Sequence, residues 1–433
     1  MLTSFDAEGA AALAGPQWLR ERRAAAFDAF VLTPLPSEKE EVWRYSPIDR
    51  LDLDAFAPPA AATAALPAAA RAVLEEISAT VGAVAGRIFV HNGFPEPPEA
   101  IDLPPGVQLG RVADVSRAGD LIGSVQHEGD ALVRLNDAFA PDAVLVDVPD
   151  NVEVGKPILI VHWCEGVGVA AFPRTAVRVG VNASASVIEV YAGALGTAPM
   201  LVVPVTELAA GNGGHLDYVS LQVLGDTAWF IDRLAAAGGQ DTTVRTFTVG
   251  LGGAYDRVRA DVRAEGKGGR SEILSAYLGN GTQVHDVRTL QDHVAPRTES
   301  ELLCQGAVAG SSRSVYSGLI RVHRGAVRTD ARQTNHNLVL DEGAHADSVP
   351  NLDILENDVK CSHASTVGPI DEDQRYYIES RGVAPEVAEG LIVRGFFDAI
   401  VERGPVPAAT PLLRREINHR LDRALGSGEG ASV

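Results

Sequence analysis

Cysteine is scarce in this chain of 433 residues, and its three cysteines lie far apart. Cys164, Cys304 and Cys361 form no C-x-x-C pair, so a single copy cannot build a zinc ribbon or a closed four-cysteine cluster site. An odd and sparse number of cysteines also argues against the disulfide framework of a small secreted protein. The sequence therefore offers no self-contained thiolate metal site.

Long apolar runs and an excess of basic residues are also missing. No stretch of about eighteen apolar residues occurs, which argues against a membrane-spanning helix. The first residues lack the basic and then apolar pattern of a signal peptide. Lys and Arg number 37 against 57 Asp and Glu, and the resulting formal charge of −20 repels nucleic acid and anionic lipid. We expect a cytoplasmic protein that binds neither nucleic acid nor membrane.

Catalytic signatures are absent as well. The chain has no G-x-S-x-G nucleophile elbow, no G-x-x-x-x-G-K-[ST] phosphate loop and no H-E-x-x-H zinc motif. Aromatic residues make up only 6% of the chain, so its core must consist largely of small and β-branched side chains in short strands or closely packed coils. We expect a protein that is not an enzyme by itself.

The central region, residues 131–368, has the pattern of β-strands almost throughout. Ile188 and Val190 flank Glu189, and Val146 and Val148 flank Asp147. Alternation with a period of two predicts that one set of side chains lies inside and the other in water. Turn signals separate these runs, and no long helical pattern intervenes, so a sheet with helical crossovers is not expected.

A short repeat narrows the choice of β-fold. Three Gly-Ala pairs begin at Gly306, Gly325 and Gly343, at separations of 19 and 18 residues. Recurrence near twenty residues is typical of the stacked coils of a β-solenoid, in which each coil returns to the same corner. The repeat favours a β-helix over a β-sandwich.

Two helical regions flank the strands. Residues 1–130 are mixed, with helices expected at 16–30 and 67–85. In residues 369–433, one apolar stripe runs through Phe396 and stops at Gly404-Pro405.

A second C-terminal helix is predicted to follow. Thr410-Pro411 supplies its N-cap and first turn, and its stripe comprises Leu413, Ile417, Leu421 and Leu425. A flexible tail is expected over residues 426–433. The two helices have two interpretations: they cap the open edge of the solenoid, or they present a docking face for another protein.

The sharpest candidate site is a pair of residues near the end of the strand region. Cys361 and His363 are two positions apart, so on a strand they lie on the same face. Thiolate and imidazole suit iron, zinc or copper, but two ligands do not close a site, and others must come from elsewhere, for example another subunit. The spacing alone favours the plainer alternative, a core cysteine and a hydrogen-bonded histidine. Structural or solvent-exposed roles are expected for His285, His293, His336 and His345.

Residues 285–400 closely resemble the SufB/SufD family of iron–sulfur cluster assembly proteins. The resemblance rests on these segments: His293 with Ala295-Pro296, Gly318 to Val322, Thr329 to Gln333, Asn335 to Leu340, Pro350 to Leu352, Asp358 to His363, Thr366 to Gly368 and Ser380 to Val383. Upstream, Gly155 to Ile158 and Trp43 to Pro47 are similar to the start of the family's core and to its N-terminal tryptophan motif. The resemblance covers nearly the whole chain.

Two features resemble the D-type rather than the B-type member of the family. The run from Lys360 to His363 has the D-type form, whereas the B-type typically carries a Glu-His-Glu variant there. Ile378 stands where the B-type has the cysteine implicated in cluster building. The sequence departs from the family pattern at His336 and at Ala364-Ser365.

The resemblance implies a right-handed parallel β-helix core between helical N- and C-terminal regions. It implies a non-catalytic scaffold that joins SufB through the β-helices and binds the ATPase SufC through the C-terminal helices. His363 would lie at the heterodimer interface as a ligand to a nascent iron–sulfur cluster, with Cys361 as a weaker candidate. The resemblance leaves open whether the isolated chain forms a homodimer. It also leaves open whether the complex uses a flavin, for which the sequence has no motif.

Three other functions remain. The chain could be a SufB-type primary scaffold, although Ile378 and the scarcity of cysteine count against this. A carbohydrate-active β-helix enzyme would need carboxylates clustered on one face of the solenoid. A purely structural β-solenoid would not bind an ATPase.

Overall fold

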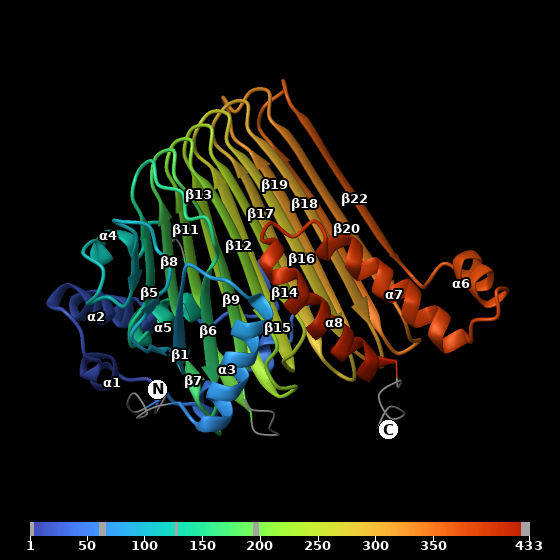
Figure 1. Ribbon diagram of the computed structural model, residues 1–433, viewed down its shortest axis with the longest axis horizontal. Coiled ribbons are helices and arrows are strands. Elements are labelled where there is room, and N and C mark those ends of the chain that lie inside the picture. Colours follow the sequence, from blue (N-terminus) through green and yellow to red (C-terminus); the bar gives the residue numbers. More distant parts are fainter. Residues whose placement is uncertain (1–3, 60–65, 126–128, 194–198, 426–433) are drawn as a thin grey trace.

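The chain folds into a parallel β-helix made of two sheets, with helices at both ends of the sequence (Figure 1). The computed structural model describes residues 4–59, 66–125, 129–193 and 199–425. Successive strands of the later coils alternate between the two sheets, so each pairs in parallel with the strand two places further on. The expected β-helix core with helical flanks is confirmed.

Over the described residues, each sheet has eleven strands. Sheet I contains, in spatial order, β2 (Phe94–Pro95), β1 (Gly86–His91), β6 (Ile158–Cys164), β9 (Ser184–Gly193), β12 (His215–Gln222), β14 (Thr243–Gly250), β16 (Arg270–Gly279), β18 (Glu299–Val308), β20 (Asp330–Val339) and β22 (Lys360–Gly368), with β3 (Glu99–Ala100) beside β1. Sheet II contains β21 (His345–Ile354), β19 (Arg313–Val322), β17 (Val284–His293), β15 (Tyr255–Ala264), β13 (Ala228–Gly238), β11 (Val205–Ala210), β8 (Arg174–Val179), β5 (Val144–Val148) and β4 (Gln108–Gly110), with β10 (Met200–Val202) and β7 (Ala170–Ala171) off this path.

The length of a coil differs from the expected repeat. Val284 lies beside Arg313, which is 29 residues later, because one coil contains a strand of each sheet and two corners. Gly306 lies within β18, whereas Gly325 and Gly343 lie in turns. The interpretation of the repeat as a return to one corner is therefore wrong, although the fold that it favoured is present.

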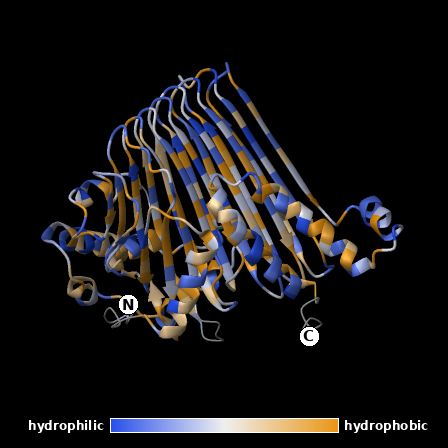
Figure 2. Ribbon diagram, in the orientation of Figure 1, coloured by the Kyte–Doolittle hydropathy of each residue, from blue (hydrophilic) through white to orange (hydrophobic). Residues whose placement is uncertain are grey.

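The strands of the first and middle coils, such as β9 of sheet I and β5 of sheet II, are buried on both faces, whereas β22 is largely exposed. Ile188 and Val190 pack in one cluster with apolar residues of the flanking helices, whereas Glu189 points between the two sheets and is fully buried. Asp147 is 8% exposed. The expectation that such alternate residues lie in water is wrong, because other elements cover the outside of these strands. Figure 2 shows hydrophobic and hydrophilic residues alternating along the strands.

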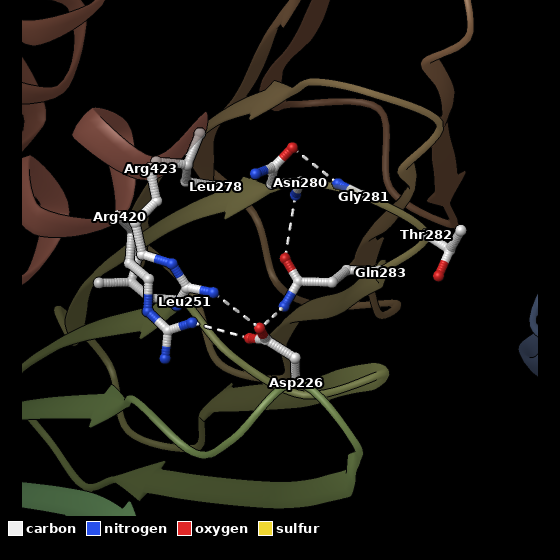
Figure 3. Close-up of a pocket in the computed structure, with 9 residues that line it drawn as sticks. All are labelled: Asp226, Leu251, Leu278, Asn280, Gly281, Thr282, Gln283, Arg420 and Arg423. Carbon is white, nitrogen blue, oxygen red and sulfur yellow. Dashed lines mark hydrogen bonds and ion pairs between the residues drawn. The ribbon is translucent and has the colours of Figure 1, made fainter. Parts of the chain in front are cut away.

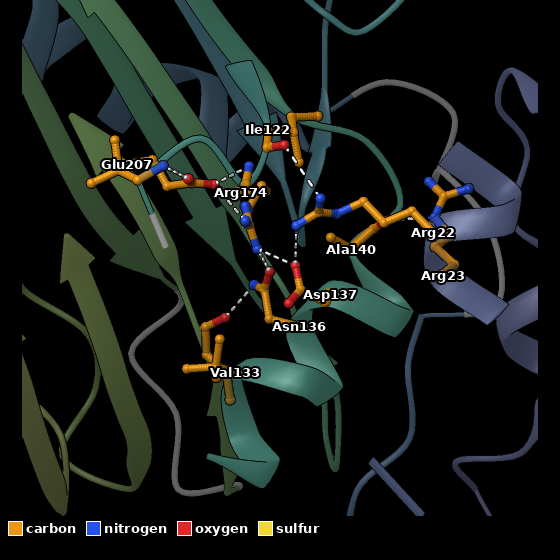
Figure 4. A network of polar contacts seen from close by, with 12 residues as sticks. Arg22, Arg23, Ile122, Val133, Asn136, Asp137, Ala140, Arg174 and Glu207 are labelled. Carbon is orange, nitrogen blue, oxygen red and sulfur yellow. Dashed lines mark hydrogen bonds and ion pairs between the residues drawn. The ribbon is translucent and has the colours of Figure 1, made fainter. Parts of the chain in front are cut away.

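The N-terminal end of the β-helix is closed. The helices α1 (Ala7–Ala12), α2 (Gln17–Leu32), α4 (Ala118–Leu121) and α5 (Ala131–Phe139) cover its first coils. The 3₁₀ turns η1 (Glu41–Trp43), η2 (Ile48–Arg50) and η3 (Leu53–Ala55) follow α2, and η1 packs on the outer face of sheet II, where Arg257 of β15 donates to the carbonyl of Val42. Buried Arg174 of β8 joins this cover to sheet II, because its guanidinium contacts Asp137 of α5 at 2.8 Å and Glu207 of β11 at 2.5 Å (Figure 4). The helix expected at residues 16–30 corresponds to α2.

Three further helices pack on or beside sheet I. The second expected N-terminal helix is α3 (Ala68–Val81), which packs in the same apolar cluster as the C-terminal helices α7 (Pro385–Val401) and α8 (Thr410–Ala424). The 3₁₀ turn η4 (Pro407–Ala409) joins α7 to α8, and α6 (Glu372–Glu379) precedes them. Within the described ranges, no helix is both long and apolar enough to cross a bilayer.

The C-terminal helices do not cap the open edge, so that interpretation is wrong. The stripe of Leu413, Ile417 and Leu421 is buried against the outer face of sheet I (Figure 1). The side chain of Thr410 does not cap α8, because Ala409 occupies the N-cap position and makes no side-chain bond. The tail expected at residues 426–433 lies outside the described residues.

Candidate functional site

The two ends of the β-helix differ in how their strand edges are protected. At the N-terminal end the outermost strands are short and antiparallel: β2 and β3 have two residues each and β4 has three. At the C-terminal end, β21 and β22 have ten and nine residues, and no strand of the described chain pairs with their outer edges. Long uncovered edges present backbone donors and acceptors to another chain. The C-terminal end is therefore the candidate docking surface.

The strand β22 carries both residues of the candidate pair. Cys361 lies beside Ala331 of β20, and His363 lies beside Gln333. Because Ala331 and Gln333 are buried within the coil, Cys361 and His363 lie on the face of β22 that continues this interior. His363 is exposed and Cys361 is half-buried. The structure thus brings the pair to one face of the last strand.

Burial disfavours the thiolate form of all three cysteines. Burial, together with the Asp330 carboxylate, raises the pKa of Cys361 above its ordinary value. Burial raises the pKa of both Cys164 and Cys304 to about 12. Thiolate is the ligand form, so imidazole is the better candidate in the pair. Among the described residues, no three His, Cys, Asp or Glu side chains form a group that could hold a metal ion.

Gln333 is a feature of the site that sequence reasoning did not single out. It is 1% exposed, and neither its Nε2 nor its Oε1 has a hydrogen-bond partner in the described structure. An unpaired buried amide costs about 1–3 kcal/mol, which favours a group that bonds to it when the site is occupied. Gln333 belongs to a run that carried the family resemblance, but its place beside His363 depends on the strand register.

A chain of hydrogen bonds ties the last strands together across the interior. The Ser365 hydroxyl of β22 donates to Ser348 Oγ of β21 at 2.6 Å, and Ser348 donates to Asn335 Oδ1 of β20 at 2.8 Å. Asn337 donates to the same oxygen at 2.8 Å. The strand that carries His363 is therefore held in place from inside the coil.

The other candidate histidines have structural or exposed positions, as expected. His285 is fully buried, with its Nδ1 2.9 Å from an Asp256 oxygen. His293 lies between the hydroxyls of Thr298 and Ser300, at 2.7 and 2.8 Å. His336 is half-buried and His345 is exposed.

A second exposed surface lies beside the open end. The helix α6 has no buried residue and stands beyond β22 (Figure 1). Tyr376 and Tyr377 of α6 are 73% and 60% exposed, and Val387 and Leu391 in the first half of α7 are 54% and 50% exposed. An apolar patch rimmed by polar residues is typical of a protein-binding surface.

Two parallel sheets, a covered N-terminal end and an open C-terminal end define the chain as a β-helix protein. The family model "SUF system FeS cluster assembly, SufBD core domain" matches residues 162–396, and "SufBD protein N-terminal region" matches residues 11–160. The chain belongs to the SufBD family of iron–sulfur cluster assembly proteins.

Curated relatives have similar lengths. An "Iron-sulfur cluster assembly SufBD family protein" of Mycobacterium leprae is 30% identical over 402 residues, covering 91% of this chain and 92% of the relative. The "Iron-sulfur cluster assembly protein SufD" of Escherichia coli is 28% identical over 374 residues, covering 86% and 85%. The Bacillus subtilis protein of that name is 27% identical over 277 residues, covering 64% and 63%.

Proposed function

We propose that this chain is a SufD-type, non-catalytic subunit of a cytoplasmic SufBCD complex. The observation that carries the proposal is the open C-terminal end, where two long strand edges are uncovered and His363 is exposed on one of them. The D-type form of residues 360–363 and Ile378 support a SufD-type over a SufB-type subunit. In the proposed heterodimer, SufB pairs with this end and completes the site.

The nascent iron–sulfur cluster is the cargo of this site. Neutral imidazole of His363 binds iron. The remaining ligands come from SufB, because the described residues of this chain bring no three His, Cys, Asp or Glu side chains together. The Gln333 amide, unpaired and adjacent in register, orients the imidazole or its bound group by a hydrogen bond. Strand β22 thus contributes one ligand, and its neighbour β20 contributes the supporting amide.

SufC is proposed to dock on α6 and the first half of α7. These segments expose apolar side chains, whereas the second half of α7 and all of α8 are anchored on sheet I through Phe397, Ile400 and Ile417. ATP-driven closure of two SufC subunits would pull on this anchor and so move the β-helix. The SufB–SufD interface would shift. Ligands that the heterodimer buries in this interface, including His363, would then become accessible to iron and sulfide.

Replacing His363 tests the site. In a complex reconstituted with SufB and SufC, His363→Ala is expected to lower the yield of assembled cluster at least tenfold, because an iron ligand is lost. Cluster is measured by visible absorption and by iron and sulfide analysis. The matched control is His345→Ala, which removes an exposed histidine from the neighbouring terminal strand β21.

The complex itself is tested by co-purification of the tagged chain with SufB and SufC. Retention of both supports the subunit assignment, whereas a chain that binds neither contradicts it. If the complex forms and His363→Ala assembles cluster at the wild-type yield, the subunit assignment stands and the role of His363 is rejected.

A further inference from the structure

The side chain of Tyr277 on β16 spans two coils of the β-helix interior. Tyr277, Gly306 and Asn337 lie in one row across the neighbouring strands β16, β18 and β20. The Tyr277 hydroxyl passes over β18 and donates to Asn337 Oδ1 of β20. A methyl group at Gly306 would overlap the tyrosine ring, so the ring can cross β18 only because this position has no side chain.

Neighbouring side chains fix the direction of the Tyr277 ring. The ring stacks on the imidazole of His285, with centroids 5.6 Å apart and an interplanar angle of 13°. His285 is held in turn, because its Nδ1 lies 2.9 Å from an Asp256 oxygen. All three side chains are buried. Tyr277 is therefore a well-ordered link between β16 and β20.

Further hydrogen bonds extend this link to the last strand. Asn337 donates to Asn335 Oδ1 on the same strand at 2.8 Å. Ser348 of β21 donates to that oxygen at 2.8 Å, and Ser365 of β22 donates to Ser348 at 2.6 Å. Four hydrogen bonds thus join Tyr277 in the middle coils to β22 at the open end.

The outer face of β16 is fastened to the C-terminal helices. Leu274 and Leu278 of β16 belong to the apolar cluster that includes Phe397 of α7. Arg403, which follows α7, contacts Glu272 of β16 at 2.6 Å. Strand β16 therefore contacts α7 on its outer face and is linked to the open end on its inner face.

We propose that Tyr277 is a positioning residue that transmits movement of α7 to β22 and so controls the accessibility of His363. This inference rests on the proposed function, because it names the residues through which SufC closure reaches the cluster site. Rigid strands and rows of hydrogen bonds carry coupling between distant sites. Loss of the hydroxyl alone breaks the row, because the phenyl ring can still stack on His285 and cross Gly306.

The variant Tyr277→Phe tests the proposal in a complex reconstituted with SufB and SufC. Diethyl pyrocarbonate modifies neutral imidazole, and peptide mass spectrometry measures its rate of reaction at His363 with and without ATP. In the wild type, ATP is expected to raise this rate about fivefold. In Tyr277→Phe, the increase should fall to less than about twofold, while complex formation and the ATPase rate are retained.

Tyr218→Phe is the matched control. Tyr218 is equally buried, but its hydroxyl donates to Glu189 of β9, at 2.6 Å, in the earlier coils. This variant should keep the ATP-dependent increase. Asn337→Val removes the acceptor of the Tyr277 bond, and combining it with Tyr277→Phe should cause no further loss, because both variants break the same row.

Three results would overturn the proposal. The first is an ATP-dependent increase in Tyr277→Phe equal to that of the wild type. The second is an equal loss in Tyr218→Phe, which would assign the effect to general destabilisation of the interior. The third is the absence of any increase in the wild type, which would also reject the movement that the proposed function assigns to SufC.

Discussion

Ionisable side chains inside the β-helix have their protonation set by burial and by their neighbours. Burial alone would raise the pKa of Glu189, but bonds from His162, Thr175 and Tyr218, each at 2.6 Å, outweigh it and hold this pKa below its ordinary value. Burial lowers the pKa of His293 to about 4, against the opposing attraction of Asp292. These side chains are structural, and their proton affinity makes stability depend on pH.

Acidification is expected to destabilise the fold through His293. Its pKa falls from 6.5 in the unfolded chain to about 4 in the folded protein, so the unfolded chain binds the proton first as the pH drops. The contribution of His293 to the free energy of unfolding is fully present above pH 6.5 and is lost as the pH falls toward 4. The loss is about 2 kcal/mol between pH 7 and pH 5. Urea unfolding at both pH values measures this loss.

The variant His293→Gln keeps groups that can bond to Thr298 and Ser300 but cannot titrate. It should be less sensitive to acid than the wild type by about 2 kcal/mol over the same interval. His345→Gln, at an exposed site, is the control and should leave the pH dependence unaltered. An unchanged dependence in His293→Gln would assign the acid sensitivity to other groups.

At the scale of elements, α8 is fastened to the β-helix by a charged contact as well as by its apolar stripe. Arg420 and Arg423 donate to Asp226, in the turn before β13, at 2.9 and 3.0 Å (Figure 3). Burial would raise the pKa of Asp226, but both guanidiniums lower it. This contact joins the last helix to the middle coils of the β-helix.

Weakening that contact should loosen α8 without unfolding the chain. Asp226→Asn removes the charge on a side chain that is 49% exposed, so a loss of only about 1 kcal/mol is expected. The apolar stripe keeps α8 in place. Amide hydrogen exchange in α8 should therefore become about fivefold faster, with little change in the strands.

Asp398→Asn is the matched control for this experiment. It removes a carboxylate that pairs with Arg414 between α7 and α8, at 2.8 Å, and does not contact the β-helix. If both variants accelerate amide hydrogen exchange in α8 equally, the contact with Asp226 does not hold the helix on sheet I.

At the scale of the whole molecule, the asymmetry between the two ends of the β-helix is the decisive feature. Helices and short antiparallel strands close one end, and hydrogen bonds from Asn335 and Ser348 hold the other end in order while leaving its edges uncovered. A long exposed edge invites pairing with another chain unless charge or a covering element prevents it. Its exposed apolar residues include Leu352 of β21 and Val367 of β22.

A charge placed on the open end should block assembly. Val367 is 44% exposed on β22, and Val367→Lys is expected to weaken the proposed association with SufB at least tenfold, because the ammonium would have to be desolvated at that interface. Analytical ultracentrifugation measures the complex and would also detect a homodimer. Val327→Lys, at a 36% exposed valine in a turn, is the control, and equal behaviour of the two variants would place the interface elsewhere.

Local patterns determined the types of element. The apolar stripes, the Gly404-Pro405 stop and Thr410-Pro411 predicted the end of α7 and both ends of α8 within a few residues, and the turn signals and period-two runs predicted a strand-rich centre. The segments of residues 285–400 that resembled the SufB/SufD family predicted the family correctly, and the spacing of Cys361 and His363 indicated the candidate pair. These features are readable because capping, helix breaking and alternation act over a few neighbouring residues.

Tertiary structure alone decided which faces are covered, how long a coil is, and what lies beside His363. Alternation around Glu189 distinguishes two faces of a strand, but sheet II excludes water from one face and the helices that pack on sheet I exclude it from the other. Register between β20 and β22 placed unpaired Gln333 beside His363. Such placements depend on contacts between residues about thirty positions apart or more, which no pattern of a few neighbouring residues can specify.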